Sequence, residues 1–229
     1  MLRRWPSQCR ICHAWPAQTL CAACTQRFTP VQARCAQCAQ ALPAGRALCG
    51  SCASAGHALD ACTACVDYAW PWTQCIAAFK YSAQPGLAGP LADLMRTHSG
   101  VQAALAQASV VLPMPLAAQR LRERGFNQSL LLARRLDAAK VDAHLLLRIR
   151  ETAPQAGLNR AERLRNVRGA FALEPARAHE VRGQHVLLVD DVMTTGATLS
   201  AAAQALRAAG AAHIGAVVLA RAAAAVAAN

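Results

Sequence analysis

The stretch VLLVDDVMTTGATLS, residues 186–200, decides the fold of this chain. Its first four residues, 186–189, are all apolar and predict a buried strand. A helix is expected to begin at the end of the stretch and to stop at Gly210, and residues 214–219 predict the next strand. The apolar face of that helix is formed by Leu199, Ala202, Ala203 and Leu206. A strand, a helix and a strand in this order make a βαβ unit, so we expect an α/β fold with a parallel sheet and flanking helices.

The loop between this strand and helix has the composition of an anion-binding site. It consists of Thr194, Thr195, Gly196, Ala197 and Thr198, whose backbone NH and hydroxyl groups can surround a phosphate at the helix N-terminus. Asp190 and Asp191 come just before the loop, at the carboxyl end of the strand, where ligands bind in such sheets. Because two carboxylates repel a phosphate unless they bind another part of the same ligand, vicinal ribose hydroxyls are their natural partners. The pattern predicts a site for a ribose 5-phosphate group.

The composition of the chain limits its class. Of 229 residues, 55% are apolar and 16% are charged, which allows one or two domains with a hydrophobic core and excludes a predominantly disordered chain. The longest apolar runs are far shorter than the roughly 20 residues that a bilayer-spanning helix needs. The first ten residues are followed by Cys12 and His13 rather than by an apolar stretch. We therefore expect no membrane span, no signal peptide and a cytoplasmic protein.

The cysteines point to metal binding in the first part of the chain. All eleven cysteines lie within the first 75 residues, and ten of them form CxxC pairs. In a reducing compartment such pairs favour zinc over disulfides, and two neighbouring pairs supply the four ligands of a structural zinc site. The simplest assignment gives two sites, Cys9, Cys12, Cys21 and Cys24 for one and Cys35, Cys38, Cys49 and Cys52 for the other, although spacing alone also allows an interleaved pairing.

The cysteine distribution also predicts a division into two domains, a zinc-binding domain at residues 1–58 and an α/β domain at residues 59–229. The first segment has few large apolar residues, so metal binding would supply its folding energy. Cys62 and Cys65 form a fifth pair without a partner pair, and we interpret them as structural or reactive thiols in preference to ligands of a third metal ion. Cys75 falls on the apolar face of an expected helix and should be packed in the core.

Further elements are expected along the second domain. They are a strand at 66–70, a helix from Pro71, a helix from near Pro90, a strand at 110–112, a helix at 126–139 and strands at 145–149 and 169–173. Trp72 and Phe79 fall on the buried face of the first of these helices, which leaves few aromatic side chains on the surface.

Positive charge is concentrated in the second domain. The net charge is +12, and residues 119–185 contain fourteen basic residues against seven acidic ones. Part of this charge serves solubility, but clusters at 122–125 and 160–168 lie beside glycine and asparagine in turn-like contexts. Such arginines favour phosphate-bearing partners, including single-stranded DNA.

Residues 186–200 resemble the phosphoribosyl pyrophosphate signature of type I phosphoribosyltransferases. With PMPL at 113–116, RERGFNQ at 122–128, QAGLNRAERLRNVRGAF at 155–171 and the CxxC pairs, the chain as a whole resembles the ComF family. In that family a double zinc ribbon precedes a phosphoribosyltransferase-like domain. The resemblance extends over nearly the full length.

The resemblance implies roles for particular residues. Asp190 and Asp191 would be the catalytic pair that holds ribose hydroxyls, and the threonine-rich loop would hold the 5-phosphate. Pro113, Met114 and Pro115 match the loop that receives pyrophosphate, and Arg122 and Arg124 would supply the positive charge that Met114 lacks. Phosphoribosyl pyrophosphate would bring Mg²⁺ with it, in addition to the two structural zinc ions.

The family resemblance implies a protein that binds phosphoribosyl pyrophosphate or a ribose 5-phosphate nucleotide and acts in DNA uptake or utilisation, or in nucleotide salvage. It leaves open whether the chain transfers pentosyl groups. The alternative is a non-catalytic uptake factor that binds single-stranded DNA, or a nucleotide sensor. Proteins of the DNA-uptake machinery would be its partners.

Overall fold

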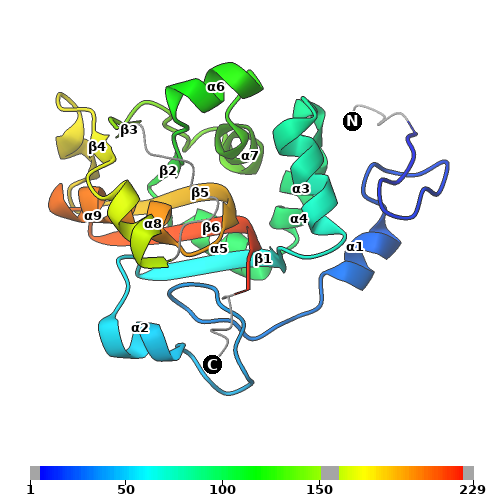
Figure 1. Ribbon diagram of the computed structural model, residues 1–229, viewed down its shortest axis with the longest axis horizontal. Helices are drawn as coiled ribbons and strands as arrows, with labels where there is room; N and C mark the ends of the chain where they lie inside the picture. The colour runs from blue at the N-terminus through cyan, green and yellow to red at the C-terminus, as the bar shows by residue number, and fades with distance from the viewer. Residues whose placement is uncertain (1–5, 151–159, 224–229) are drawn as a thin grey trace.

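The computed structural model describes residues 6–150 and 160–223, and it is built around one parallel sheet (Figure 1). The sheet has four strands in the spatial order β1-β6-β5-β2, and every neighbouring pair is parallel. The strands are β1 (Ala61–Asp67), β2 (Val110–Pro113), β5 (His185–Met193) and β6 (His213–Arg221). The expected α/β fold with a parallel sheet is confirmed.

The expected βαβ unit is present at the C-terminal end of the described chain. Helix α9 (Ala197–Ala208) connects β5 to β6, and the four predicted apolar positions on it are at most 1% exposed. Gly210 follows the helix with φ +91°, a left-handed conformation that glycine adopts without strain. The predicted end of the helix at Gly210 is therefore confirmed.

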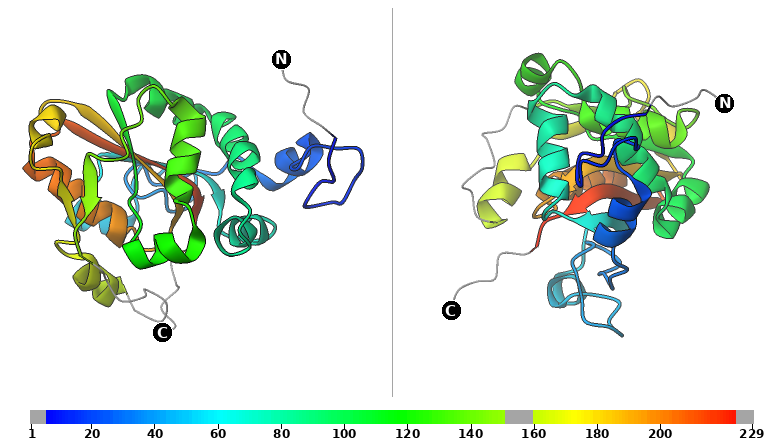
Figure 2. Two further views of the ribbon diagram at one scale, coloured as in Figure 1. Left: turned by 90° about the horizontal axis from the view of Figure 1, so that it is seen from above. Right: turned by 90° about the vertical axis from the view of Figure 1, so that its right-hand side faces the viewer.

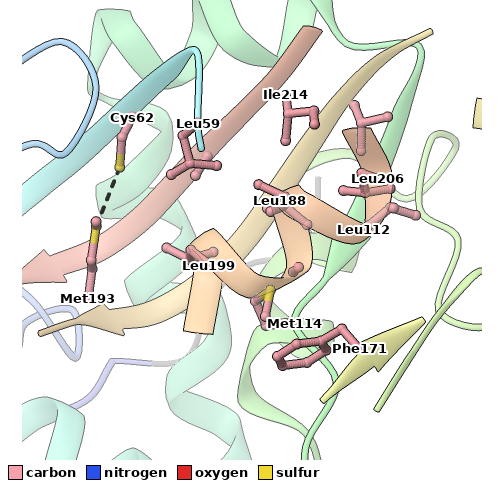
Figure 3. Close-up of a cluster of buried hydrophobic side chains, with 14 of the residues drawn as sticks. Leu59, Cys62, Leu112, Met114, Phe171, Leu188, Met193, Leu199, Leu206 and Ile214 are labelled. Atoms are coloured by element: carbon pink, nitrogen blue, oxygen red, sulfur yellow. Dashed lines mark hydrogen bonds between the residues drawn. The ribbon is translucent and has the colours of Figure 1, made fainter. Parts of the chain in front are cut away.

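Helices cover both faces of the sheet, and side chains of β5 alternate between the two faces. Val186 and Leu188 pack with α9, whereas Leu187 and Val189 pack against the helices of the opposite face. The opposite face is covered by α3 (Trp72–Tyr81), α4 (Ala88–Arg96), α5 (Ser99–Gln107) and α7 (Gln128–Asp137). Figure 3 shows the cluster on the α9 side, where Leu199 and Leu206 meet Leu188 and Ile214. Burial on both faces explains why these strands are continuous apolar runs.

Smaller elements surround this core. They are η1 (Pro85–Leu87), α6 (Ala118–Arg124), β3 (Leu146–Arg148), α8 (Arg160–Val167), β4 (Phe171–Leu173) and η2 (Ala178–Val181). The strands β3 and β4, which the sequence predicts near these positions, pair with each other in a separate antiparallel sheet. Among the described residues, no helix combines the length and the apolar character that crossing a membrane requires.

Two expected strands have different limits in the structure. β1 occupies Ala61–Asp67 rather than 66–70, so Cys62 and Cys65 both lie within this strand. β5 continues past 189 to Met193, which places Asp190 and Asp191 within the strand rather than after it. Both differences have one cause, because β6 extends to Arg221 and offers hydrogen-bonding partners along its full length to the strands on either side.

The two cysteine-rich segments lie against different faces of the sheet. The first contains α1 (Ala22–Phe28) and projects beside α3 and α4, where the Trp72 indole donates a hydrogen bond to the Phe28 carbonyl at 2.7 Å (Figure 2). The second contains α2 (Gly50–Ala55), below β1 in Figure 1. Three of its cysteines belong to the same hydrophobic cluster as α9. Trp72, Cys75 and Phe79 are buried as predicted, at 3% exposure or less.

Candidate functional site

A cavity of about 170 Å³ opens at the carboxyl ends of β2 and β5. The sequence predicts a ligand-binding site at this edge of the sheet. Nine of the predicted site residues line it: Asp190, Asp191, Thr194, Gly196, Ala197, Thr198, Met114, Pro115 and Arg124. The cavity therefore gathers the acidic pair, most of the threonine-rich loop and part of the 113–116 loop into one space.

Three predicted residues are not among those lining this cavity. Pro113 is buried in β2 opposite Val189. Thr195 turns its hydroxyl toward its own loop, where it accepts a hydrogen bond from the Ala197 backbone at 3.4 Å. Arg122 is exposed on α6, and Arg120 lines the cavity together with Arg124. Positions 120 and 124 are one helical turn apart and share a face, whereas position 122 lies on the other side.

The threonine-rich loop has the backbone shape of an anion cradle. Gly196 has φ +79° and directly precedes α9, so the N-terminus of that helix, with Ala197 and Thr198, lines the cavity. A Cβ atom at this position would lie 2.4 Å from Met193 Cε. The end of the flexible Met193 side chain would have to shift, and the left-handed backbone conformation is the main reason for glycine at position 196.

The acidic pair is held by two residues that the sequence analysis missed. The Lys80 ammonium lies 2.8 Å from Asp191 Oδ1, and both side chains are at most 15% exposed. Asp190 Oδ1 accepts hydrogen bonds from the Ser129 hydroxyl at 2.8 Å and from the Asp191 backbone at 2.9 Å. A signal for Lys80 does exist in the sequence, because it follows Ile76 by four residues on the buried face of α3.

These contacts set the charge of the site. Burial raises the pKa of Asp190 to about 7, and the adjacent Asp191 carboxylate acts in the same direction against Lys80 and Ser129. Burial acts to lower the pKa of Lys80, but the Asp191 carboxylate outweighs it and holds that pKa above its usual value. The ammonium therefore stays charged at neutral pH, while the carboxyl group of Asp190 holds a proton more readily than an exposed aspartate does.

Asn127 connects the 113–116 loop to α7. Its side-chain oxygen accepts hydrogen bonds from the backbone of Ser129 at 2.9 Å and of Leu130 at 3.3 Å, which caps the helix. Its amide nitrogen donates to the Met114 carbonyl at 3.0 Å. This one side chain fixes the loop, the start of α7 and hence the hydroxyl of Ser129 relative to one another.

Eight cysteines form two clusters with the neighbour pairing that the sequence favoured, and not the interleaved one. In each cluster the four sulfur atoms lie within 4.8 Å of one another. The Cys12–Cys21 and Cys38–Cys49 Sγ···Sγ distances are both 3.7 Å. A tetrahedral zinc ion with Zn–S bonds of about 2.3 Å requires sulfur atoms about 3.8 Å apart. The two clusters therefore fit zinc.

The remaining cysteines are packed away from solvent. Burial raises the pKa values of Cys62 and Cys65 to about 12, which keeps both thiols protonated and unreactive at neutral pH. The Cys62 thiol points to the Met193 sulfur at 3.7 Å (Figure 3). Of the two roles left open for this pair, the structural one fits these surroundings.

Arg221 links the second cysteine cluster to the threonine-rich loop. Its side chain is buried, and its guanidinium donates to the Cys38 carbonyl at 2.9 Å and the Met193 carbonyl at 3.2 Å. It also donates to the carbonyl of Thr194. One buried group therefore bonds to a CxxC turn and to the first residue of the anion cradle, a connection that no sequence motif indicates.

Comparisons with known proteins show which proteins this chain is similar to. Residues 125–228 match the phosphoribosyl transferase domain family. The DNA utilization protein YhgH of Escherichia coli strain K12 is 36% identical over 154 residues, which cover 65% of this chain and 66% of that protein. The protein of the same name from Salmonella typhi is 32% identical over 183 residues, covering 70% of this chain and 77% of its own length. Competence protein F of Haemophilus influenzae is 34% identical over 119 residues, covering 50% of this chain and 49% of that protein. The chain thus spans just under two thirds of the Escherichia coli relative.

Proposed function

The chain belongs to the ComF family of competence and DNA utilization proteins, and we propose that its cavity binds phosphoribosyl pyrophosphate or a ribose 5-phosphate nucleotide. The observation that carries this proposal is the placement of the Gly196 cradle and the acidic pair in one cavity. The cradle offers helix NH groups to a phosphate, and the acidic pair offers acceptors to sugar hydroxyls.

In this proposal different residues of the cavity bind different parts of the ligand. The loop around Gly196 donates hydrogen bonds to the 5-phosphate, and Asp190 and Asp191 accept hydrogen bonds from the ribose hydroxyls. Arg120 and Arg124 line the same cavity and would face the pyrophosphate. If the chain transfers the phosphoribosyl group, pyrophosphate leaves the anomeric carbon as positive charge develops on the sugar. The chain would then act by positioning the sugar and by placing the carboxylates close to that charge.

Mg²⁺ would neutralise the pyrophosphate charge when it enters with the ligand. Lys80 already pairs with Asp191, so the acidic pair does not present two free carboxylates to a metal ion. The fitting partners of Mg²⁺ are instead pyrophosphate oxygens and water, as this ion prefers. We propose zinc for the two cysteine clusters, where it would hold the CxxC turns in place.

For the biological role we propose DNA uptake or utilisation, with proteins of the uptake machinery as partners. An alternative role is favoured by the charge of the chain, which is +12, and by Arg120, Arg124 and Arg148 along the cavity wall. In this alternative the cavity binds the phosphodiester backbone of single-stranded DNA, or senses a nucleotide, without turnover.

The proposed ligand site is tested by calorimetric titration with phosphoribosyl pyrophosphate. Wild-type protein should bind it, and Gly196→Ala should weaken binding by about tenfold, because alanine disfavours a left-handed backbone. Gly86→Ala is the matched control, since a Cβ atom there meets no other atom within 4 Å. Equal affinities for wild type and Gly196→Ala would contradict the cradle assignment.

Two further measurements separate the enzyme from the DNA-binding factor. Pyrophosphate release from phosphoribosyl pyrophosphate in the presence of a panel of bases identifies a transferase. Single-stranded DNA affinity that falls steeply with salt, without turnover, identifies the alternative. In that case Arg120→Ala with Arg124→Ala should weaken DNA binding more than Arg134→Ala with Arg135→Ala, a control pair that removes equal charge from the exposed face of α7.

A further inference from the structure

An aromatic side chain stands on the wall of the cavity beside the acidic pair. Tyr81 is the last residue of α3, and it lines the cavity although 72% of its surface is exposed. The guanidinium carbon of Arg124 lies 5.0 Å from the centre of the Tyr81 ring. A large exposed ring that is already in contact with a planar cation is a surface on which flat ligands stack.

Gln128 places a buried hydrogen-bond donor in the same cavity. Its side chain is 1% exposed, and its Oε1 atom accepts a hydrogen bond from Arg124 at 3.1 Å. Since arginine only donates, this contact identifies the oxygen and fixes the amide orientation. The remaining atom, Nε2, has no hydrogen-bond partner within residues 6–150 and 160–223. Such an unpaired buried donor is costly, and an acceptor on a bound ligand would satisfy it.

Both residues are sequence neighbours of the groups that hold the acidic pair. Lys80, next to Tyr81, contacts Asp191 at 2.8 Å. Ser129, next to Gln128, donates to Asp190 at 2.8 Å. A ligand whose ribose sits at the acidic pair therefore has the ring of Tyr81 and the amide of Gln128 within reach of the substituent on its sugar.

We propose that Tyr81, Arg124 and Gln128 form a nucleobase subsite that selects bases with a carbonyl edge. The base stacks on the Tyr81 ring, and Gln128 Nε2 donates a hydrogen bond to the base. Because Arg124 only donates and the Gln128 oxygen is already engaged, the subsite offers donors to the edge of the base. An oxygen acceptor, as in hypoxanthine or uracil, satisfies these donors, whereas the amino group of adenine or cytosine faces them with a donor of its own. This subsite rests on the proposed ribose 5-phosphate site.

The test compares ligands that differ only in the base. Ribose 5-phosphate, inosine monophosphate and adenosine monophosphate are titrated into the full chain by calorimetry. Inosine monophosphate should bind about fivefold to a hundredfold more tightly than ribose 5-phosphate, the range that stacking on an aromatic ring supplies. It should also bind more tightly than adenosine monophosphate, and uridine monophosphate should likewise exceed cytidine monophosphate.

Variants of Tyr81 and Gln128 test which residue causes each of these differences in affinity. In Tyr81→Ala the ratio of the inosine monophosphate and ribose 5-phosphate affinities should fall to near one, and Tyr81→Phe should restore it. Tyr68→Ala, which removes an exposed tyrosine outside the cavity lining, should keep the wild-type ratio. Gln128→Met should abolish the preference for inosine over adenosine monophosphate while stacking is retained.

The outcomes distinguish the subsite from the site on which it rests. If ribose 5-phosphate binds and inosine monophosphate binds no more tightly, the base subsite is wrong and the proposed function stands. Equal affinities for the oxo and amino bases in the wild type would overturn the carbonyl selectivity. Failure of both ribose 5-phosphate and inosine monophosphate to bind would overturn the proposed function together with the subsite.

Discussion

Replacing both members of the acidic pair, Asp190→Asn with Asp191→Asn, should abolish phosphoribosyl pyrophosphate binding and also lower the free energy of unfolding by about 3–5 kcal/mol. The second effect follows from Lys80, whose ammonium lies 2.8 Å from Asp191 with only 15% of its side chain exposed. With both carboxylates gone, a buried positive charge is left without its ion-pair partner. Urea unfolding and calorimetric titration measure the two effects separately.

A third substitution separates the stabilising role of this pair from its binding role. Adding Lys80→Met removes the unpaired charge, so the triple variant should regain most of the lost stability but none of the binding. If the double variant unfolds at the same urea concentration as the wild type, the loss of the ion pair with Lys80 does not destabilise the fold. If the triple variant binds phosphoribosyl pyrophosphate as tightly as the wild type, Asp190 and Asp191 do not take part in ligand binding.

The second large effect is expected on loss of the metal site at Cys35, Cys38, Cys49 and Cys52. Elemental analysis should find two zinc ions in the wild-type chain and one in Cys35→Ser with Cys38→Ser. The apparent zinc-binding free energy of such a site is about 10–16 kcal/mol, and this cluster shares a hydrophobic core with α9. We therefore expect the thermal unfolding of the whole α/β domain, followed by circular dichroism, to shift to lower temperature.

The first cluster offers the matched control. Cys9→Ser with Cys12→Ser should also remove one zinc ion, but that segment packs beside α3 and α4, away from the threonine-rich loop. Arg221 joins the loop to the Cys38 carbonyl, so only loss of the second site should weaken phosphoribosyl pyrophosphate binding. Equal ligand affinities in the two variants would contradict this link.

The features that the sequence predicted well are local in the chain. The strand, loop and helix around residues 186–210 follow from apolar runs, helical spacing and one glycine. The pairs of cysteine thiols follow from the CxxC spacing, which places two thiols in one turn, whereas this spacing leaves open which pairs join into one cluster. In each case the interacting groups are separated by a few residues, so their spacing already contains the geometry. The division into domains at residues 58 and 59 stays a prediction.

What the sequence could not predict depends on contacts between distant segments. Lys80 meets Asp191, and Ser129 meets Asp190, only because α3 and α7 cover the same face of the sheet. Arg221 reaches Cys38 across nearly the whole chain. Whether Arg120 or Arg122 lines the cavity depends on where α6 begins, and the composition of this helix does not determine its first residue. Helical spacing places Lys80 on the buried face of α3, but nothing in the sequence shows which residue each of these side chains meets.

The order of strands in the sheet has a consequence for how the protein is made. Strand β1 pairs only with β6 in the sheet, and the hydrogen bond from Ile214 to Asp60 at its start closes a separation of 154 residues. The cysteine clusters, by contrast, are complete once residue 52 has been synthesised. A chain emerging from the ribosome can therefore close its metal sites early but must hold β1 without a neighbour until β6 appears. During that interval the backbone NH and carbonyl groups of β1 are open to pairing with other chains. The cysteine-rich segment, whose Ala36 carbonyl accepts a hydrogen bond from the Cys62 backbone at 2.7 Å, is the part of the nascent protein that can cover them.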